Sequence, residues 1–286
     1  MSTKKEFMIV FPHAKINLGL NVVGVRPDGY HNIETVFLPI GYSDILEVTL
    51  PQEQTETGVV WAMAGNVLAV PMEKNLCVRA LNALRREVSF PTIGLHLTKL
   101  IPDGAGLGGG SSDAAFVLTT LNSLLHLGLS PEKLMRVAAS IGADCPFFIG
   151  GSPVLATGVG DVFTPVSLPV LQTMRVVVVV PAGAVSTVDA YRNVGCRLPD
   201  VPLPDALKHP IEEWKRVIRN DFEEYVTSRV PDVAVFKEIL YAHGAVYAQM
   251  SGSGSSVFAF FPPGVELPCI EAFAGARGYW AGNVTL

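Results

Sequence analysis

The chain has 286 residues, of which 49% are hydrophobic and 16% are charged, with 21 lysines and arginines against 26 aspartates and glutamates. Its length suits two domains or one large one, and its apolar content is sufficient for a sizeable core. The formal net charge of −5 argues against a nucleic-acid partner, because nucleic-acid-binding domains carry a basic surface. We therefore expect any polyanion to be bound by backbone dipoles and a few lysines rather than by a broad positive field.

The four cysteines, Cys77, Cys145, Cys196 and Cys269, lie far apart and include no C-x-x-C pair. This spacing argues against a zinc site and a dense disulfide framework, so we interpret them as buried thiols in a reducing compartment. The most apolar short run, residues 176–180, is far too short to span a bilayer, and the first residues lack the apolar stretch of a signal peptide. We expect a cytoplasmic monomer or homodimer with no membrane partner.

The first hundred residues are predicted to form mainly strands. Apolar and polar residues alternate loosely here, and turn-forming residues interrupt the alternation. The expected strands are residues 6–23, 33–37, 45–50 and 93–100. The segments that separate them are a turn at 26–29, a break at 41–44 and a polar loop at 52–58. The exception is a helix over 75–88, whose apolar residues fall on one face at helical spacing.

The middle of the chain changes to helix. A glycine-rich segment, residues 102–112, leads directly into a run rich in alanine and leucine that predicts a buried helix over 113–127. A second helix is predicted over residues 131–141, and its start is indicated by Ser130, a favourable N-cap, and Pro131, which is favourable at the first helical position.

The second half is predicted to be a separate domain. Gly150-Gly-Ser-Pro153 marks the junction, so we assign residues 1–155 to one domain and 156–286 to the other. The proline-rich residues 197–210 are predicted to be an irregular loop. The expected strands are residues 154–156, 162–166, 174–180, 246–250 and 257–261, and the expected helices are 221–229 and 233–242.

The glycine-rich segment has the composition of a phosphate-binding loop. Glycines before a helix expose backbone N–H groups that can close on a phosphate oxygen, and the start of the helix adds its dipole. Two serine hydroxyls can donate further hydrogen bonds, or one can hold a metal ion. The residues expected to bind the nucleotide are Pro102, Asp103, Gly104, Ala105, Gly106, Leu107, Gly108, Gly109, Gly110, Ser111 and Ser112.

Several kinds of nucleotide site are compatible with this composition alone. A Walker A loop is excluded, because no glycine in the chain is followed by lysine. Gly104, Gly106 and Gly109 satisfy G-x-G-x-x-G, but a Rossmann site also needs an acidic residue after a second strand, where this chain has a predicted helix. The loop of protein kinases joins two strands, whereas a helix follows here. The alternative to a nucleotide site is a group of glycines that binds no ligand and only allows a helix to pack closely.

A wider pattern resembles a known family. Pro102-x-x-x-Gly-Leu-Gly-Gly-Gly-Ser-Ser112-x-Ala-Ala115 is similar to the phosphate loop of the GHMP kinases, a superfamily of small-molecule kinases. Its long glycine run resembles the branch that phosphorylates an alcohol carrying a cytidine diphosphate group. The resemblance implies ATP as co-substrate, together with Mg²⁺. It also implies a two-domain α/β (α+β) fold, with an N-terminal domain like ribosomal protein S5, a ferredoxin-like C-terminal domain and the active site in the cleft between them.

The same resemblance supplies catalytic candidates. Lys15 and Asn17 lie in Pro12-His-Ala-Lys-Ile-Asn17, and Asp144 lies in Gly142-Ala-Asp-Cys-Pro-Phe147, both similar to motifs of that branch. Phosphoryl transfer needs a group that accepts the proton of the hydroxyl and a cation that offsets charge on the transferred group. The resemblance assigns the first role to Asp144 and the second to Lys15, with Asn17 at the substrate. From the residues alone, Lys15 could be a surface charge and Asp144 a turn or cap residue.

The resemblance also implies a site for a pyrimidine, which needs an aromatic partner for its face and hydrogen bonds for its edge. Tyr30 and His31, which follow Asp-Gly, are assigned the first aromatic contact and the edge contacts. Thr187 and Tyr191, in a Ser-Thr-x-x-x-Tyr segment, are assigned a substrate contact and the second aromatic. Lys99, which precedes the glycine loop, is expected to reach a nucleotide phosphate or base. Its alternative is a solvated strand end.

One further motif and one departure from the family pattern complete the sequence evidence. Met250-Ser-Gly-Ser-Gly-Ser-Ser256 resembles the third motif of the superfamily, whose glycines let the backbone approach the phosphate loop, although a plain hairpin turn would look the same. Cys145 stands where valine is usual, and a thiol beside Asp144 could make the site sensitive to oxidation.

Three rival functions differ in the sequence features that they require. A GHMP kinase for homoserine, mevalonate or a sugar is disfavoured by the aromatic set, because those substrates have no base to stack. A non-catalytic protein of the same fold is disfavoured by the presence of both Lys15 and Asp144. An NAD-dependent enzyme is disfavoured by the missing ribose-binding acid.

Overall fold

The computed structural model describes residues 7–66 and 70–284. These residues form two compact units, and the chain passes from one unit to the other several times. The first unit contains the described residues up to 14 together with 43–103 and 108–151, and the second contains 15–42, 104–107 and the described residues from 152 onward. The division into continuous domains at residues 155 and 156 stays a prediction.

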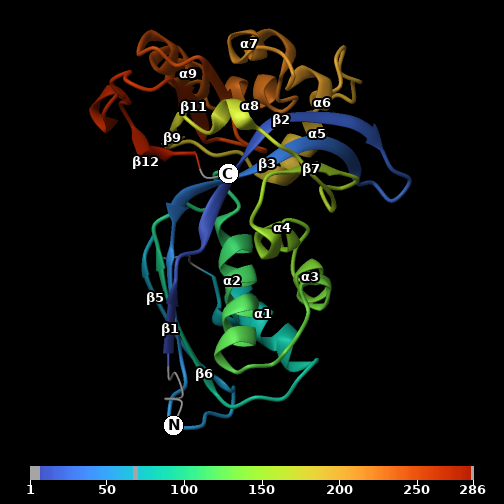
Figure 1. Cartoon of the computed structure of the whole chain (residues 1–286), viewed down its shortest axis with the longest axis vertical. Helices are drawn as coiled ribbons and strands as arrows, with labels where there is room; N and C mark the ends of the chain where they lie inside the picture. Colours follow the sequence, from blue (N-terminus) through green and yellow to red (C-terminus); the bar gives the residue numbers. More distant parts are fainter. Residues whose placement is uncertain (1–6, 67–69, 285–286) are drawn as a thin grey trace. The chain divides into compact units, whose positions relative to one another are not determined.

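The first unit is built on a four-stranded sheet with the strand order β1-β4-β6-β5. β5 runs parallel to β6, whereas the other neighbours are antiparallel. The strands are β1 (Phe7–Val10), β4 (Ile45–Thr49), β5 (Val59–Gly65) and β6 (Ile93–Lys99). In Figure 1 the helices of this unit lie along one side of the sheet. They are η1 (Met72–Lys74), α1 (Leu76–Arg85), α2 (Gly109–Leu124), α3 (Pro131–Ala139) and α4 (Cys145–Gly150).

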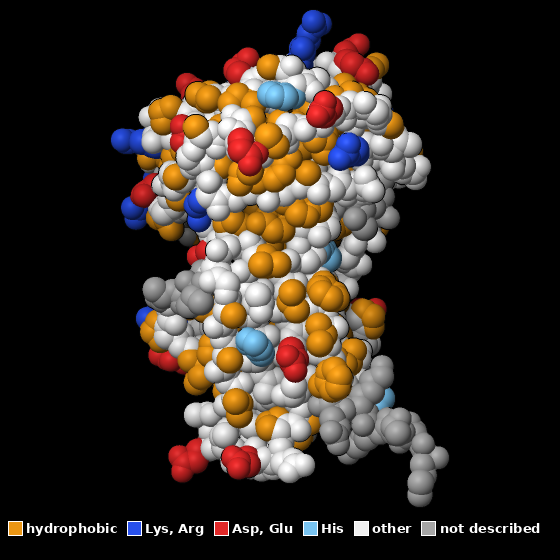
Figure 2. All heavy atoms as spheres, turned by 90° about the vertical axis from the view of Figure 1, so that its left-hand side faces the viewer, with side chains coloured by type: hydrophobic (Ala, Val, Ile, Leu, Met, Phe, Trp, Pro, Cys, Tyr) orange, Lys and Arg blue, Asp and Glu red, His pale blue; other side chains and the backbone are white. Residues whose placement is uncertain are grey.

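The two faces of this sheet differ in burial. Alternate residues of β4 and β6, such as Val48 and Leu95, turn toward α1 and α2 and form the core of the unit. The other face carries exposed apolar side chains, among them Phe7, Ile9 and Val60, and it is turned to the reader in the lower half of Figure 2. The alternation of apolar and polar residues in these strands therefore reflects a sheet that is covered by helices on one face only.

The second unit contains two four-stranded sheets, with the orders β2-β3-β7-β8 and β10-β11-β9-β12. The valines of β9, Val176 to Val180, are all buried, because this strand lies inside its sheet between β11 and β12. The strands of the first sheet are β2 (His13–Val25), β3 (His31–Ser43), β7 (Val154–Thr157) and β8 (Val162–Pro165). Those of the second are β9 (Arg175–Pro181), β10 (Tyr247–Met250), β11 (Val257–Phe261) and β12 (Ala276–Asn283).

Helices of the second unit close its core. α9 packs against β9, β10 and β11, and its residues Val233, Phe236 and Leu240 are buried among their side chains. Most of the other helices are single turns in the segments that connect the strands. The helices are η2 (Pro169–Leu171), α5 (Thr187–Asn193), α6 (Leu203–Ala206), η3 (Ile211–Glu213), α7 (Trp214–Val217), α8 (Glu223–Arg229), α9 (Asp232–Ala242) and η4 (Ile270–Ala272).

Most predicted strands and helices are confirmed, but several boundaries are not. β3 continues through Ser43, so that the predicted break at 41–44 shrinks to Asp44. α2 begins at Gly109, inside the glycine-rich segment rather than after it. The irregular loop expected at 197–210 is interrupted by α6, so that prediction is wrong in part. The strands β5 and β12 and the helix α4 are absent from the prediction.

The expectation of four buried thiols is half right. Cys77 and Cys145 are buried, whereas Cys196 and Cys269 are exposed. The two exposed cysteines lie outside helices and strands, one after α5 and the other before η4, where no sheet or helix face covers them. Among the described helices, none combines the length and the apolar character that crossing a membrane requires.

Candidate active site

The glycine-rich loop takes a path that only glycine adopts readily. Gly104, Gly106 and Gly108 have φ angles of 60°, 77° and 70°, in the left-handed region. α2 starts at the next residue, with Gly108 as its N-cap and without a hydrogen bond from a capping side chain. The first amides of a long helix thus follow directly on a glycine-rich loop, which is the arrangement that binds phosphate groups.

The loop also approaches the third motif closely. The Ser251 hydroxyl donates to the carbonyl oxygen of Gly106 at 3.0 Å, and the backbone N–H of Ser256 donates to the carbonyl oxygen of Ala105 at 3.2 Å. A Cβ on Gly106 would lie 2.1 Å from the carbonyl oxygen of Ser251. The approach of residues 250–256 to the phosphate loop is therefore confirmed, and it depends on a glycine at position 106.

Replacing Gly106 by alanine is expected to destabilise the protein by about 1–3 kcal/mol more than replacing Gly128 by alanine, because only the first change forces overpacking. Both glycines have φ angles in the left-handed region, 77° and 67°. A Cβ on Gly128 would meet no atom within 4 Å. Urea unfolding of the two variants checks this, and equal losses would show that backbone strain rather than the close approach requires Gly106.

The side chains of the loop differ in exposure. Pro102, Ala105 and Leu107 are buried and contribute packing, whereas Asp103 is exposed. Ser112 is fully buried, and its hydroxyl oxygen has no hydrogen-bond partner among the described residues. Buried polar groups are usually paired, so this oxygen, in the first turn of α2, fits a partner supplied by a ligand.

The Cys145 thiol is fully buried in this structure. Burial raises its pKa to about 11, although a hydrogen bond with the Ser111 hydroxyl acts in the opposite direction. Because the thiolate is the species that oxidants attack, a pKa this high disfavours oxidation at neutral pH. The structure therefore argues against the hypothesis of an oxidation-sensitive site next to Asp144.

Lys15 is held in the interior of the second unit. Its side chain is 4% exposed, which rules out the surface alternative. The ammonium Nζ donates to Asn17 Oδ1 at 2.5 Å and to the carbonyl oxygen of Gly106 at 3.3 Å, and it lies 4.9 Å from the centre of the Phe37 ring. The backbone N–H of Lys15 also donates to the carbonyl oxygen of Leu107 at 2.9 Å. A buried cation is thus fixed against the glycine-rich loop.

Asp144 lies in the first unit, at the residue before α4. It occupies the N-cap position, yet its side chain makes no capping hydrogen bond and the residue has αR backbone angles. A capping aspartate would have extended angles and would accept from the helix start, so the cap alternative is not supported. The half-buried carboxylate therefore does not cap α4, although the residue itself lies in a turn.

The residues expected at the pyrimidine lie in the second unit. The rings of His31 and Tyr191 are 5.0 Å apart at an interplanar angle of 38°, and Tyr191 also packs edge-on against Phe222 at 4.8 Å. Tyr30 is 66% exposed, at the end of a tight turn. The Thr187 hydroxyl is hydrogen-bonded to Ser253 at 2.9 Å. The structure brings His31 and Tyr191 together and leaves the Tyr30 ring accessible.

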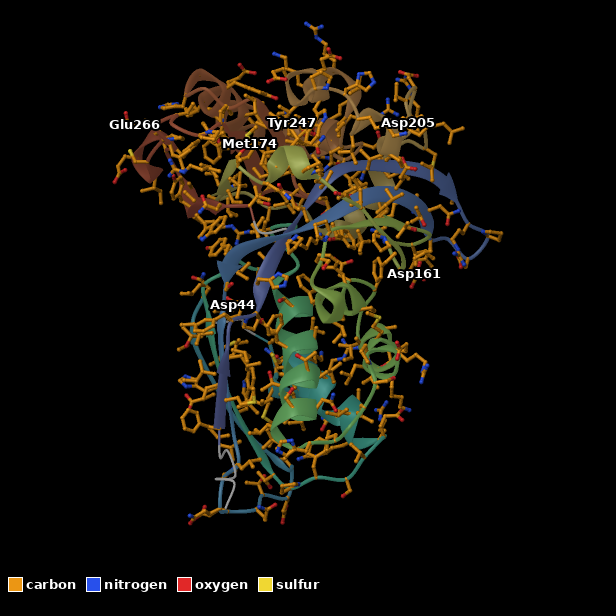
Figure 3. The ribbon with its side chains drawn as sticks, in the orientation of Figure 1. Asp44, Asp161, Met174, Asp205, Tyr247 and Glu266 are labelled. Atoms are coloured by element: carbon orange, nitrogen blue, oxygen red, sulfur yellow. The ribbon has the colours of Figure 1, made fainter. Side chains whose placement is uncertain are left out.

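Lys99 does not behave as predicted. It is 2% exposed, and its ammonium is bound by the carboxyl groups of Asp44, labelled in Figure 3, and of Asp113 at 2.8 Å. Two buried carboxyl groups occupy the ammonium, so the prediction that Lys99 reaches a nucleotide phosphate or base is not supported, and neither is a solvated strand end. We interpret Lys99 as a residue that positions the glycine-rich loop through these two carboxyl groups.

The cluster of Asp44, Lys99 and Asp113 ties together the two ends of the loop. Asp44 Oδ1 accepts from the backbone N–H groups of Leu100 at 2.6 Å and Ile101 at 2.8 Å, where the chain leaves β6. Asp113 belongs to the first turns of α2, beyond the loop. One ammonium therefore links the chain before the loop to the helix after it.

The protonation states of Asp113 and Lys99 explain why this charged cluster can be buried. Burial raises the pKa of Asp113 to about 8, against the opposing effect of the Lys99 ammonium. Burial alone would lower the pKa of Lys99, but the carboxyl groups of Asp113 and Asp44 raise it above its usual value. At neutral pH one proton is therefore held on Asp113, so that one carboxylate faces one ammonium and the cluster has no uncompensated buried charge.

Sequence reasoning missed four residues that support the candidate site. Asp44 and Asp113 bind Lys99, Ser251 binds the loop at Gly106, and the Thr35 hydroxyl accepts from Asn17 Nδ2 at 3.0 Å. Asp113 directly follows the two serines of the loop, and Ser251 is the first serine of the third motif, so both had a local signal. Asp44 and Thr35 had none, because their partners lie far away in the chain.

Comparison with known proteins agrees with these features. Residues 75–152 match the family model for the GHMP kinases N terminal domain, and residues 203–273 match the model for GHMP kinases C terminal. A 4-diphosphocytidyl-2-C-methyl-D-erythritol kinase of Parabacteroides distasonis is 49% identical over 256 residues, covering 89% of this chain and 92% of the relative. The enzyme of the same name from Bacteroides fragilis is 47% identical, covering 90% and 93%.

A solved structure leads to the same family. The crystal structure of a 4-(cytidine 5'-diphospho)-2C-methyl-D-erythritol kinase is 33% identical in sequence and superimposes with a TM-score of 0.77, covering 96% of this chain and 98% of that one. The two-domain fold expected from the phosphate loop is thus confirmed, and the use of ATP follows from the family. The chain belongs to the GHMP kinases, and among them to the family of the 4-diphosphocytidyl-2-C-methyl-D-erythritol kinases.

Proposed function

We propose that the protein transfers the γ-phosphate of ATP to the 2-hydroxyl of 4-diphosphocytidyl-2-C-methyl-D-erythritol, giving the 2-phosphate and ADP in non-mevalonate isoprenoid biosynthesis. The observation that carries the proposal is the buried Lys15 ammonium, which lies 3.3 Å from a carbonyl oxygen of the glycine-rich loop. Relatives of that name that are 49% and 47% identical support the choice of substrate.

The glycine-rich loop binds the phosphates of ATP in this proposal. Backbone N–H groups at the start of α2 point at the phosphate oxygens, and the fully buried hydroxyl of Ser112 donates to one of them. The loop needs no broad positive surface for this task, which agrees with the net charge of −5.

Asp144 and Lys15 carry out the chemistry. The carboxylate of Asp144 accepts the proton of the attacking hydroxyl, so that the oxygen can form a bond to the γ-phosphorus while the bond to the β-phosphate oxygen breaks. Lys15 offsets the negative charge that spreads over the transferred group, and it is held in place before the substrate binds.

The aromatic residues select the substrate. Tyr30 stacks on one face of the cytosine and Tyr191 on the other, while His31 binds its edge and Thr187 and Asn17 contact the rest of the substrate. The accessible ring of Tyr30 and the contact of His31 with Tyr191 support this assignment.

We further propose that Mg²⁺ accompanies ATP. Among the described residues, no group of three or more His, Cys, Asp or Glu side chains is placed to hold a metal ion. In phosphoryl transfer, substrate phosphates and water supply most ligands of magnesium. We assign no protein ligand to the ion. The cytoplasmic location and the monomeric or homodimeric state stay predictions.

The proposal is tested by ADP release from ATP. The purified enzyme is offered 4-diphosphocytidyl-2-C-methyl-D-erythritol beside mevalonate, homoserine and galactose, at equal concentrations. We expect release of ADP with the cytidine compound alone. Release with one of the other three alcohols and none with the cytidine compound would overturn the proposal and leave a kinase of different specificity.

Replacing Tyr30 by alanine is expected to raise the KM for the cytidine substrate about 5- to 150-fold, because a stacked base contributes about 1–3 kcal/mol. The KM for ATP should stay within about twofold, because ATP is assigned to the loop. Initial rates at varied concentrations of each substrate give both values. Tyr30→Phe keeps the ring and is the matched control. Equal increases in both KM values would contradict the assigned role.

A further inference from the structure

Thr35 lies beside the residue that holds Lys15, although neither a motif nor the proposed chemistry includes it. It is fully buried in β3. Its hydroxyl donates to the carbonyl oxygen of Gly19 at 2.5 Å and accepts from Asn17 Nδ2 at 3.0 Å. Asn17 Oδ1 in turn accepts from the Lys15 ammonium at 2.5 Å. The four groups form one continuous chain of hydrogen bonds inside the second unit.

The polarity of this chain follows from counting protons. A hydroxyl has one proton to donate, and the carbonyl of Gly19 can only accept, so the Thr35 proton must point at Gly19. Toward Asn17 the hydroxyl can then only accept, which requires the NH₂ group of the Asn17 amide on that side. The carbonyl oxygen of the same amide therefore faces Lys15. Reversing the amide would place NH₂ against an ammonium and leave two donors unpaired in the interior.

Apart from Thr35 and Lys15, no contact of Asn17 with the described residues sets this orientation. Its backbone N–H donates to Ser251 Oγ at 3.0 Å, which fixes the main chain but leaves the side-chain amide free to turn. A Cβ on Gly252 would lie 3.0 Å from Asn17 Oδ1, which limits the space around the oxygen without distinguishing oxygen from nitrogen. The Lys15 ammonium selects the oxygen at one end of the amide, and the hydroxyl of Thr35 selects the NH₂ group at the other end.

We propose that Thr35 is a positioning residue for phosphoryl transfer: it orients the Asn17 amide, whose oxygen holds the Lys15 ammonium at the glycine-rich loop. This inference rests on the role of Lys15 in the proposed function. A small displacement of a catalytic group costs far more in rate than in binding, because the charge that Lys15 offsets develops in the transition state.

The kinetic test compares Thr35→Val, which keeps the shape but has no hydroxyl, with Thr35→Ser, which keeps the hydroxyl. We expect kcat to fall about 10- to 100-fold in the valine variant, as for other small displacements of catalytic groups, and to recover in the serine variant. The KM for ATP should stay within about twofold of the wild-type value in both. Equal kcat values for the two variants would overturn the inference.

Two controls separate positioning from a general loss of structure. Thr92→Val removes a buried hydroxyl that accepts from Thr55 N at 3.0 Å in the first unit, and it should leave kcat unchanged. In a Lys15→Ala background, Thr35→Val should lower the residual kcat by less than about twofold, because coupled residues are not additive. The same loss with and without Lys15 would show that Thr35 does not act through Lys15.

A readout independent of turnover completes the test. In protein labelled with ¹⁵N-asparagine, the side-chain NH₂ protons of Asn17 should exchange slowly in the wild type and in Thr35→Ser, and rapidly in Thr35→Val. Unchanged exchange in the valine variant overturns the inference whether or not the cytidine compound is the substrate. Absence of phosphate transfer by the wild type instead overturns only the proposed function. If Thr35→Val does not fold, Thr35→Cys, a weak acceptor, takes its place in both comparisons.

Discussion

Asparagine in place of Asp144 is expected to lower kcat by about 10²- to 10⁴-fold, the usual contribution of a general base. The amide keeps the size of the side chain and a carbonyl oxygen, but it cannot take up the proton of the attacking hydroxyl. Because Asp144 makes no capping hydrogen bond to α4, the change should not unfold the helix. The variant should therefore bind ATP and the cytidine substrate but fail at the chemical step.

Three measurements check this result. Steady-state rates give kcat, calorimetry gives the affinity for ATP, and thermal unfolding shows whether the fold is kept. Asp161→Asn is the matched control, since Asp161, labelled in Figure 3, lies in a turn where its carboxylate accepts from the N–H of Val159 at 3.1 Å, which an amide oxygen can replace. Wild-type turnover in the Asp144 variant would remove Asp144 as the base.

The parts of the site that could be predicted are those whose signal is local. The glycines at 104, 106 and 108 indicate a left-handed path, and the structure shows positive φ at each of them. Ser130 followed by Pro131 indicates a helix start, and the Ser130 hydroxyl accepts from Lys133 N as an N-cap should. In each case a few neighbouring residues determine the backbone, so no knowledge of the rest of the fold is needed.

The elements that could not be predicted lack such a signal. β5, with the sequence Val-Val-Trp-Ala-Met-Ala-Gly, is an edge strand that pairs in parallel with β6, and its weak alternation does not distinguish it from a loop. α4 has six residues, which is too short for helical periodicity to appear. Their conformations depend on the strand or helix beside them.

The surroundings of Lys99 could not be predicted for the same reason, on a larger scale. A lysine before a phosphate loop looks like a phosphate ligand as long as its neighbours are unknown. Its carboxyl partners are 55 and 14 residues away in the sequence, and only the folded unit brings both to the ammonium. Long-range pairs of this kind determine the charge state of a site. Neither the periodicity of apolar residues nor the spacing of motifs predicts such pairs. The hydrogen bond between Ser251 and Gly106, 145 residues apart, is a further example.

The role of Lys99 leads to a second large effect, on stability. Lys99→Met is expected to lower the free energy of unfolding by about 3–5 kcal/mol at neutral pH, the cost of breaking a buried ion pair on one side. Methionine fills much of the same volume, but Asp44 and Asp113 lose the ammonium that lies between them. Lys208→Met is the matched control, since Lys208 forms an exposed pair with Asp205 at 2.7 Å and should lose at most about 1 kcal/mol.

The pH dependence of this loss distinguishes a buried charge from lost packing. In the wild type the folded-state pKa of Asp113 is raised to about 8, mainly by burial, so the folded state holds a proton that the unfolded chain has released. Stability therefore falls as the pH rises toward 8. Without the Lys99 ammonium that pKa rises further, so the loss caused by Lys99→Met should increase from pH 5 to pH 9. Urea unfolding across this range checks the sign, and a loss that is independent of pH would indicate packing alone.

Removing the charges together should reverse most of the damage. In Lys99→Met combined with Asp44→Asn and Asp113→Asn, no charge is left in this cluster, and the amide oxygen at position 44 can still accept from Leu100 and Ile101. Replacing a whole buried ionic cluster is often close to neutral, whereas removing one partner is not. The triple variant should therefore unfold at a higher urea concentration than Lys99→Met. A triple variant less stable than the single one would show that the carboxyl groups stabilise the loop without their cation.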